Sequence, residues 1–319
     1  MVGPTVAIMT DETGWHTRQL QAALRTRGGI GRCVDLADCR IDTTAAWHGL
    51  VIPGFGRELP DAVMVRGIAG GSFEQVTKRL GVLHALRDLG VPVYNDARAI
   101  ERSVDKSMTS LLLHAARIAT PPTWATESQA EAQQIVMRES ARGHALVLKP
   151  LFGSQGKGLQ LVGRVDGVHH ALPDIAQACG SLAYLQRFVP PTASPGFDWR
   201  VLVIGGQAVT AMRRVSTHWV HNVAQGARCE PALLTDALAR LAESAAEALG
   251  MDYAGVDLIP TAPAAGEQSA ANVQVIEVNG VAAWHGLQRV TSFNIARAIV
   301  DDLLDRKLAA QRARLPMSA

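Results

Sequence analysis

Two stretches near the end of the chain, GVDLI at residues 255–259 and VIEVNG at residues 275–280, decide the fold and the site. Both are apolar runs bounded by turn formers, a pattern that predicts buried strands. Side chains alternate along a strand, so Glu277 and Asn279 share one face. If the strand carrying Asp257 pairs alongside, three oxygen ligands converge, and such a set suits Mg²⁺.

The same residues have a simpler interpretation, in which Asp257 and Glu277 only cap strand ends or pair with nearby arginines. Acidic strand ends occur at functional and non-functional sites alike. The two stretches by themselves therefore leave both interpretations open.

The composition narrows the class of protein. The chain has 319 residues and a formal net charge of +2, which gives no reason to expect nucleic acid or an anionic membrane as a partner. It contains no apolar run of membrane-spanning length and no signal pattern at its start. The four cysteines, Cys33, Cys39, Cys179 and Cys229, show no CxxC spacing, so we expect reduced, mostly buried thiols in a cytoplasmic protein.

The first third of the chain alternates predicted strands and helices, which favours a small doubly wound parallel sheet. Arg66 and Asn95 follow predicted strands, and ligands of such sheets collect at the carboxyl ends of strands. Each is therefore a candidate for substrate contact, although Arg66 could equally be a surface salt-bridge partner. Residues 10–14 lack the G-x-G-x-x-G spacing, which disfavours a hydride-transferring dehydrogenase. The predicted elements are strands at 5–9, 61–66 and 91–94, and helices at 18–27 and from Ser72 to about Leu89.

A glycine-rich segment, PLFGSQGKG at 150–158, lies between predicted strands at 145–149 and 159–162. Glycines let a backbone approach phosphate oxygens closely, while Ser154 adds a hydroxyl and Lys157 a charge. The spacing is not that of a Walker A loop, and no helix follows the loop. An ordinary flexible turn is the alternative, but Lys149 at the preceding strand end favours nucleotide phosphate.

The last third predicts a strand ending at the rigid Pro190-Pro191 segment, a plausible hinge, and then a hairpin around Gly205-Gly206. We expect residues 261–271 to form an exposed hairpin loop and the basic tail through Arg314 to be solvated. The remaining predicted elements are strands at 182–189, 198–204 and 208–212, and helices at 108–117, 128–139, 235–249 and 291–305.

Taken in order, these residues resemble the ATP-grasp superfamily, and within it the RimK-like carboxylate–amine ligases. The resemblance implies an α/β fold with a doubly wound pre-ATP-grasp domain (1–97), a central lid subdomain (98–187) and a C-terminal ATP-grasp domain with the metal site (188–319). The stretches that carry it are Asp105-Lys106, LVLKPLFGSQG at 146–156, LQRF at 185–188, DWR at 198–200, AMRR at 211–214, Asn222 with Gly226, AGVD at 254–257 and EVN at 277–279.

The resemblance also implies a role for each matching residue. Lys106 and Lys149 would contact ATP phosphates, Lys149 also lying near the adenine. Asp257, Glu277 and Asn279 would hold Mg²⁺, with two ions expected and Mn²⁺ as a substitute. The loop with Gly153, Ser154, Gln155 and Gly156 would close over the triphosphate; Gln186, Arg187, Phe188 and Val189 would line the adenine pocket; Arg214 and Asn222 would stabilise the transferring phosphate, and Arg200 would anchor a substrate or position the metal ligands.

The implied chemistry is ATP-dependent amide formation through an acyl phosphate, in which positioning and charge neutralisation matter more than a protein nucleophile. Within the family the chain looks closest to ligases that attach glutamate to coenzymes such as tetrahydromethanopterin or a deazaflavin. The expected partners are thus glutamate and a small carboxylate acceptor, and we expect a homo-oligomer. A glutamate ligase acting on a protein C-terminal tail is one alternative, and a non-catalytic ATP-binding scaffold is another.

The family pattern breaks in two places, at Ala224-Gln225, where relatives often carry a basic residue, and at residues 280–286, where many show a Pro-Gly turn. The second break is where we expect the acceptor. His218, His221 and His285 lie near these positions but are left out of the catalytic set, because hydrogen-bonding or surface roles are commoner. Trp219 and Trp284 could stack on a coenzyme ring, although packing is the simpler role.

Overall fold

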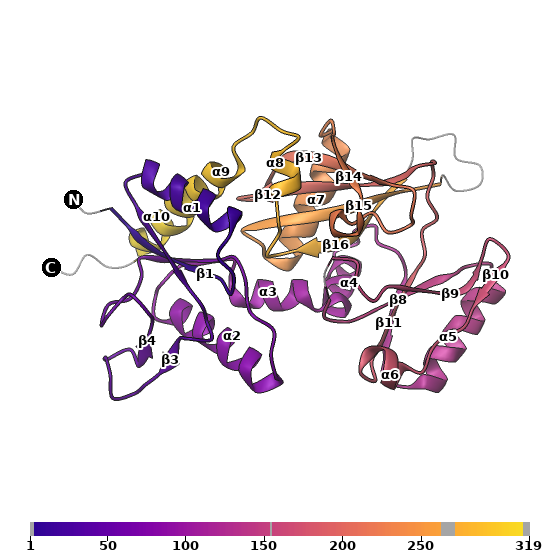
Figure 1. The fold of residues 1–319 in the computed structure, drawn as a ribbon, viewed down its shortest axis with the longest axis horizontal. Coiled ribbons are helices and arrows are strands. Elements are labelled where there is room, and N and C mark those ends of the chain that lie inside the picture. Colours follow the sequence, from indigo (N-terminus) through magenta and orange to yellow (C-terminus); the bar gives the residue numbers. More distant parts are fainter. Residues whose placement is uncertain (1–2, 154, 263–271, 315–319) are drawn as a thin grey trace.

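The computed structural model describes residues 3–153, 155–262 and 272–314. It contains three larger sheets arranged along the molecule (Figure 1). The N-terminal sheet lies at one end, the C-terminal sheet at the centre, and the sheet of the middle segment at the other end. Helices α3 (Ala97–Val104) and α4 (Lys106–Ala115) run between them.

The N-terminal sheet is parallel, with strand order β2-β1-β5-β6, as the alternating pattern predicts. Ser72 caps the second helix by accepting a hydrogen bond from the Gln75 amide. The edge strand β2 was not predicted, because its residues alternate only weakly between exposed and buried positions. The elements are β1 (Thr5–Met9), α1 (Trp15–Thr26), β2 (Ile30–Val34), β5 (Ala62–Val65), α2 (Phe73–Asp88) and β6 (Val93–Tyr94), with a small pair β3 (Arg40–Ile41) and β4 (Leu50–Val51) beside them.

The middle segment folds into an antiparallel sheet of order β10-β9-β8-β11-β7, with two helices packed against it. Its apolar side chains, among them Ile135, Leu146 and Leu185, form a core that is separate from the others. We call this unit the lid. Its elements are β7 (Thr123–Thr126), α5 (Gln129–Ala141), β8 (Leu146–Lys149), β9 (Gln160–Val165), β10 (Val168–His170), α6 (Ile175–Cys179) and β11 (Ala183–Arg187).

The C-terminal sheet is antiparallel, with strand order β14-β13-β12-β15-β16. The predicted pairing of the two decisive stretches is confirmed, because Asp257 of β15 lies directly opposite Glu277 of β16. The alanine-rich helix α7 packs its buried face against this sheet. The elements are β12 (Gly196–Ile204), β13 (Gln207–Ser216), a 3₁₀ turn (Val223–Gln225), β14 (Arg228–Pro231), α7 (Asp236–Leu249), β15 (Tyr253–Thr261) and β16 (Asn272–Asn279).

The last segment returns to the N-terminal sheet, and α9 packs against α1 (Figure 1). The expectation of a solvated tail after residue 305 holds in part, because five of the eight residues from 306 to 313 are exposed, although the segment is helical. The helix continues to Arg314, because Leu308 is buried and Arg306 and Lys307 both pair with the Asp252 carboxylate, at 2.9 Å and 2.6 Å. The elements are α8 (His285–Gln288), α9 (Ile295–Asp301), a π-helical stretch (Asp302–Leu308) and α10 (Ala309–Arg314).

A single apolar core joins the N-terminal and C-terminal sheets. It contains Ile8 from the first sheet and Leu24 from helix α1 beside it, Leu202 and Tyr253 from the second sheet, and Trp284 from the segment that crosses between them. Tyr94 stacks on Tyr253, with the two ring centroids 5.6 Å apart. These two sheets are therefore held together by a continuous core.

The remaining expectations are settled only in part. The predicted hairpin loop at 261–271 lies, from residue 263 on, outside the described residues. All four cysteines are free, but only Cys39 is buried, so the expectation of mostly buried thiols was wrong. In the described ranges no helix combines the length and apolar character needed to cross a bilayer.

Candidate functional site

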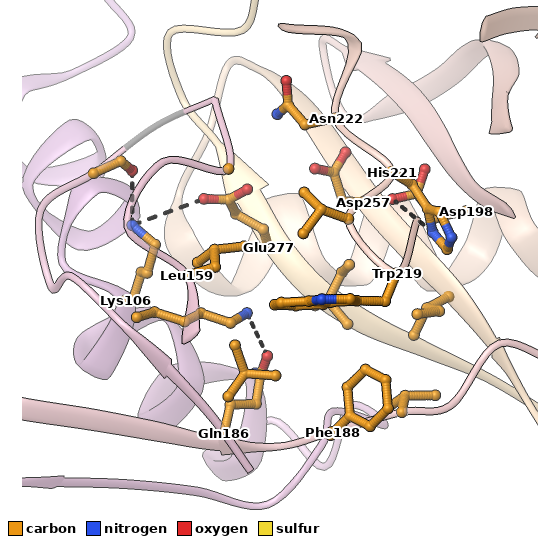
Figure 2. Close-up of a pocket in the computed structure, with 18 of the residues that line it drawn as sticks. Lys106, Leu159, Gln186, Phe188, Asp198, Trp219, His221, Asn222, Asp257 and Glu277 are labelled. Carbon is orange, nitrogen blue, oxygen red and sulfur yellow. Dashed lines mark hydrogen bonds and ion pairs between the residues drawn. The ribbon is translucent and has the colours of Figure 1, made fainter. Parts of the chain in front are cut away.

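A cavity lies between the lid and the C-terminal sheet, and Figure 2 shows part of its lining. It brings together residues from segments far apart in the sequence, as expected for a nucleotide site. The residues predicted for this site that line it are Lys106, Lys149, Gly153, Gln155, Gly156, Gln186, Arg187, Phe188, Val189, Arg214, Asn222, Asp257 and Glu277. Ser154 lies outside the described residues.

Lys106 connects the glycine-rich loop to the C-terminal sheet. It is the first residue of α4, whose N-terminus is capped by the Asp105 carboxylate. Its ammonium donates to the carbonyl oxygen of Gly153 at 2.8 Å and lies 3.9 Å from a carboxylate oxygen of Glu277 (Figure 2). Burial lowers the pKa of Lys106, so this cation is poorly solvated and ready to bind an anion.

Lys149, the last residue of β8, donates to the side-chain oxygen of Gln186 at 2.6 Å. Burial lowers its pKa to about 8, against a smaller opposing effect of Glu277. Keeping the buried ammonium of Lys149 charged costs free energy while no ligand is bound. A bound phosphate group would reduce that cost.

The glycine-rich loop after β8 closes against the segment 219–225. Gly156 has a φ of +68°, and a Cβ atom there would lie 2.8 Å from a Val220 methyl carbon, so only glycine fits. The carbonyl oxygen of Gln155 accepts a hydrogen bond from the Gln225 side chain at 3.2 Å. The loop thus already contacts the C-terminal domain.

The end of the cavity opposite the carboxylates is aromatic. Figure 2 shows Trp219 extending into the cavity, and its ring meets Phe188 edge to face at a centroid distance of 5.8 Å. Arg187 also lines the cavity, but its guanidinium pairs with the buried Glu139 at 2.6 Å. Four apolar residues of the cavity wall were not predicted from the sequence, namely Val147, Leu159, Ile259 and Ile276. They lie on predicted strands, and strand alternation was the signal that could have identified them.

Three buried charges, Asp198, Arg214 and Asp257, and the partly buried Arg200 form an ion-pair network at the carboxylate end. Arg214 pairs with both oxygens of Asp198, at 2.7 Å and 2.6 Å, and with Asp257 at 3.0 Å. Arg200 donates to both oxygens of Asp257, at 2.5 Å and 2.6 Å. Burial raises the pKa of Asp198. Burial also acts to raise the pKa of Asp257, but Arg200 and Arg214 outweigh it and hold that pKa below its usual value.

The arginine pairing of Asp257, the simpler interpretation at the outset, is therefore real. Asp198 is one of the two carboxylates of this network, and the sequence predicted no role for it. The hairpin of β12 and β13 places Asp198 opposite Arg214, and β12 and β15 place Arg200 opposite Asp257. Cross-strand register is the signal that could have found the second of these pairs.

The oxygen donors also fit a hard divalent cation. Glu277 lies across from Asp257 at the surface of the cavity, and only the 3.9 Å contact with Lys106 engages its carboxylate among the described residues. Asn279 donates its amide N–H to the Gly255 carbonyl at 3.2 Å, which leaves its side-chain oxygen as an acceptor. Two carboxylates and an amide oxygen are ligands that Mg²⁺ accepts, provided that Asp257 is shared with its arginines.

A second cavity lies between the N-terminal and C-terminal sheets. It is lined by the loop 10–17, by Arg66 and by the segment 281–286, where the family pattern breaks. Arg200 and Asn279, the predicted residues absent from the first cavity, line this one. The residues that line both cavities are Gln155, Arg214, Asn222 and Glu277. The two cavities therefore meet at the predicted site of phosphoryl transfer.

Asn95, the other strand-end candidate for substrate contact, is structural instead. It is fully buried, donates to the carbonyls of Tyr253 and Gly280, and accepts from the amides of Asp252 and Tyr253. All of its strong hydrogen-bonding capacity is used in joining the two sheets, so nothing remains for a ligand.

The histidines fall into different settings. His221 is buried at the first cavity, with one ring nitrogen 4.0 Å from Asp198, and burial lowers its pKa to about 4. His285 lines the second cavity, and His218 is exposed. Among the described residues, none of these three side chains forms a hydrogen bond with a residue that lines both cavities.

The comparisons with known proteins agree with this geometry. Residues 5–100 match the RimK PreATP-grasp domain, and residues 103–303 match the RimK-like ATP-grasp domain. A relative in Methanocaldococcus jannaschii, named tetrahydromethanopterin:alpha-L-glutamate ligase, is 33% identical over 248 residues, which cover 76% of this chain and 79% of the relative. A protein of the same name in Methanosarcina acetivorans is 29% identical, covering 92% of this chain and 97% of its own.

Among solved structures, the ATP-grasp ligase PsnB complexed with a phosphomimetic precursor variant, Mg and ADP superposes with a TM-score of 0.67 at 20% identity. The superposition covers 97% of this chain and 99% of that one. The shared fold, the two family matches and the named relatives lead to one conclusion: the chain belongs to the RimK-like ATP-grasp family and is an ATP-grasp ligase.

Proposed function

We propose that this protein joins the amine of L-glutamate to a carboxylate of a small coenzyme of the tetrahydromethanopterin type, with cleavage of ATP to ADP and inorganic phosphate. The support from relatives is that two of them carry that activity in their names and align with most of this chain. The observation that carries the proposal is the wall shared by the two cavities, because two adjoining cavities suit a nucleotide and a second substrate that must react with each other.

In this proposal the first cavity binds ATP. Lys106 and Lys149 neutralise phosphate charge, and their lowered pKa values mean that bound phosphate stabilises them in return. Gln155 and Gly156 cover the triphosphate with the rest of the loop, while Phe188, Val189 and Trp219 enclose the base. Gln186 fixes the Lys149 ammonium, and Arg187 contributes through its backbone because its side chain pairs with Glu139.

Asp257, Glu277 and Asn279 are the residues that would hold Mg²⁺, or Mn²⁺ in its place, with room in the donor set for a second ion at the carboxylates. The metal would supply charge neutralisation between the phosphate groups. Arg200 positions Asp257 through two hydrogen bonds, so that this carboxylate keeps one orientation whether or not a cation is present.

The reaction then needs two steps. A carboxylate oxygen of the coenzyme attacks the γ-phosphorus of ATP, the bond to the ADP oxygen breaks, and an acyl phosphate forms. The glutamate amine attacks the acyl carbon, loses a proton, and expels inorganic phosphate. Arg214 and Asn222, on the shared wall, are placed to stabilise the charge on the transferring phosphate. The loop at 153–158 would exclude water, which would otherwise hydrolyse the acyl phosphate.

The test is a mass-spectrometric screen with ATP, Mg²⁺, L-glutamate and tetrahydromethanopterin. The proposal predicts a product heavier by one glutamyl residue, with ADP released only when both substrates are present. A mass shift on a purified protein tail instead would indicate the protein-modifying alternative. Nucleotide binding without turnover across a panel of carboxylates and amines would indicate the scaffold alternative.

A further inference from the structure

The second cavity contains a cation that the proposed chemistry does not use. Arg66 follows β5 and is half-buried in the cavity wall. One of its guanidinium nitrogens donates to the Val281 carbonyl at 2.9 Å, and the guanidinium carbon lies 5.3 Å from the centre of the Trp284 ring. In the described parts of the chain no carboxylate forms an ion pair with Arg66, so of the two interpretations left open by the sequence the surface salt bridge is not observed.

A guanidinium has five N–H donors, and the Val281 carbonyl accepts a hydrogen bond from one of the guanidinium nitrogens of Arg66. The contact with the Trp284 ring and the Val281 bond hold the guanidinium in place without neutralising it. Burying a charge without a partner costs free energy unless a ligand supplies the partner. Arg66 is thus fixed in position and lacks a counter-charge.

His16 lies beside this arginine and reports on its charge. One ring nitrogen of His16, Nε2, accepts the backbone N–H groups of Trp284 and His285, at 3.1 Å and 3.2 Å. That places the proton of the neutral ring on Nδ1. Burial, followed by the charges of Arg66 and His285, lowers the pKa of His16 to about 4. Asp11 and Glu12, both exposed, lie on the same lining in the loop 10–14, but neither forms an ion pair with Arg66.

We propose that Arg66 anchors a second, non-reacting carboxylate of a substrate, so that the N-terminal domain selects a ligand with two carboxylates or a carboxylate beside the reacting group. This rests on the proposed function, since it assigns the other end of the same substrate cavity. The reacting group lies at the shared wall with Arg214 and Asn222, and the anchored carboxylate lies at Arg66. Recognition at both ends would fix the orientation of the substrate before phosphoryl transfer.

Two molecules could supply this carboxylate, namely the amino acid and the coenzyme acceptor. Kinetics with Arg66→Met separates them, because an anchor acting equally in ground and transition states changes KM more than kcat. We expect KM for one substrate to rise about 10- to 100-fold, the loss of a charge-assisted hydrogen-bonded pair, with kcat within about threefold of wild type. A rise for L-glutamate identifies the amino acid, and a rise for tetrahydromethanopterin identifies the acceptor.

Arg66→Lys should recover part of the affinity, because it restores the charge without the forked geometry. Arg18→Met, an exposed arginine on α1 outside both cavities, is the matched control and should leave both KM values unchanged. Unchanged KM values in Arg66→Met, or a fall in kcat alone, would overturn the proposal while leaving the ligase function intact.

A second measurement is independent of turnover. The imidazole nitrogens of His16 in ¹⁵N-labelled wild-type protein can be followed by NMR with L-glutamate alone and with tetrahydromethanopterin alone, both without ATP. A carboxylate on Arg66 should shift these resonances and raise the titration midpoint of His16 by about one pH unit, because it offsets the nearby positive charge. No shift with either compound at saturating concentration would overturn the proposal, even if the ligase reaction is confirmed.

Discussion

The two junctions that the C-terminal sheet makes with its neighbours are built differently. On the side of the N-terminal sheet, one apolar core crosses the junction, and Asn95 fastens it with buried hydrogen bonds. On the side of the lid, the apolar cores are separate, and the contacts at the cavity include the hydrogen bonds of Lys106 with Gly153 and of Gln225 with Gln155. The rings of Phe188 and Trp219 also meet there, edge to face. The first junction therefore has a continuous apolar core, and the second does not.

Under the proposed function, this difference between the junctions suits each cavity to a different substrate. A cavity bounded by one core keeps its shape, which suits the recognition of a defined coenzyme. A cavity closed by a unit with its own core can admit a nucleotide and then exclude water. Both cavities still depend on the wall they share, so the largest effects are expected there.

Glu277→Gln changes that shared wall and should have the largest effect. It removes a metal-binding charge while keeping the shape, and we expect kcat to fall by about 10³-fold, the scale of losing one transition-state electrostatic contact. The measurement is ADP release at saturating substrates. Glu230→Gln on β14, whose carboxylate pairs with Arg213 away from the cavities, is the control and should remain near wild type. Turnover of Glu277→Gln within a few-fold of wild type would remove the metal assignment.

Asn95→Ala tests the junction between the N-terminal and C-terminal sheets. It leaves two backbone carbonyls and two backbone amides without their buried partner, so we expect a loss of about 3 kcal/mol in the free energy of unfolding. Ile135→Val in the separate lid core is the comparison and should cost about 1 kcal/mol. Urea denaturation measures both, and equal losses would argue against a specially fastened junction.

Lys149→Met tests the cavity between the lid and the C-terminal sheet. The variant loses a phosphate-neutralising cation, so we expect the Kd for ATP to rise about 10- to 100-fold. Because Lys149 lines only the first cavity, the KM for the coenzyme should stay within about twofold. Calorimetric titration with ATP measures the first quantity, and an equal weakening of coenzyme binding would show that the two cavities are not independent.

The pH dependence of ATP binding should show a smaller effect from the same residue. The pKa of Lys149 in the empty protein is lowered to about 8, and bound phosphate should raise it. Between pH 8 and the higher pKa of the complex, binding takes up a proton, so affinity should fall as pH rises, by at most about tenfold per unit. Lys149→Arg stays charged and should show a flatter profile between pH 7.5 and 9.5. A wild-type profile as flat as that of the variant would contradict this account.

Sequence reasoning predicted most of the architecture because the periodic signals were strong. The pairing of residues 255–259 with 275–280 followed from two apolar runs, and Ser72, Ser128 and Thr235 cap helices where hydroxyls precede apolar periodicity. The glycine-rich loop was placed correctly because its glycines separate two apolar runs, which form the strands β8 and β9.

The partner of Asp198 could not be predicted in the same way. A regular two-residue turn at Gly205-Gly206 would place Arg213 opposite Asp198. The register shifts between Leu202 and Val203, and Arg214 takes that place instead. Arg213 then points away and pairs with Glu230 at 2.7 Å. A single extra residue in one strand, which leaves no clear trace in the sequence, thus selects the arginine that enters the site.

The lining of the second cavity was predicted only in part. Residues 280–286 stood out because they depart from the family pattern, but Trp15 and His16 did not, since they meet that segment across some 270 positions of sequence. Gly280 is explained by packing, because a Cβ atom there would lie 2.7 Å from the Ser103 hydroxyl. Contacts of this kind depend on how the two sheets come together, and local patterns do not encode them.

The central claim, that this ligase activates a carboxylate as an acyl phosphate, is tested most directly with tetrahydromethanopterin labelled with ¹⁸O in its carboxylates. The labelled compound is incubated with ATP, Mg²⁺, L-glutamate and the wild-type protein, and the inorganic phosphate is analysed by mass spectrometry. The account predicts one ¹⁸O atom in each phosphate released, because the oxygen that attacks the γ-phosphorus leaves with it. Amide formation with unlabelled phosphate would contradict the account.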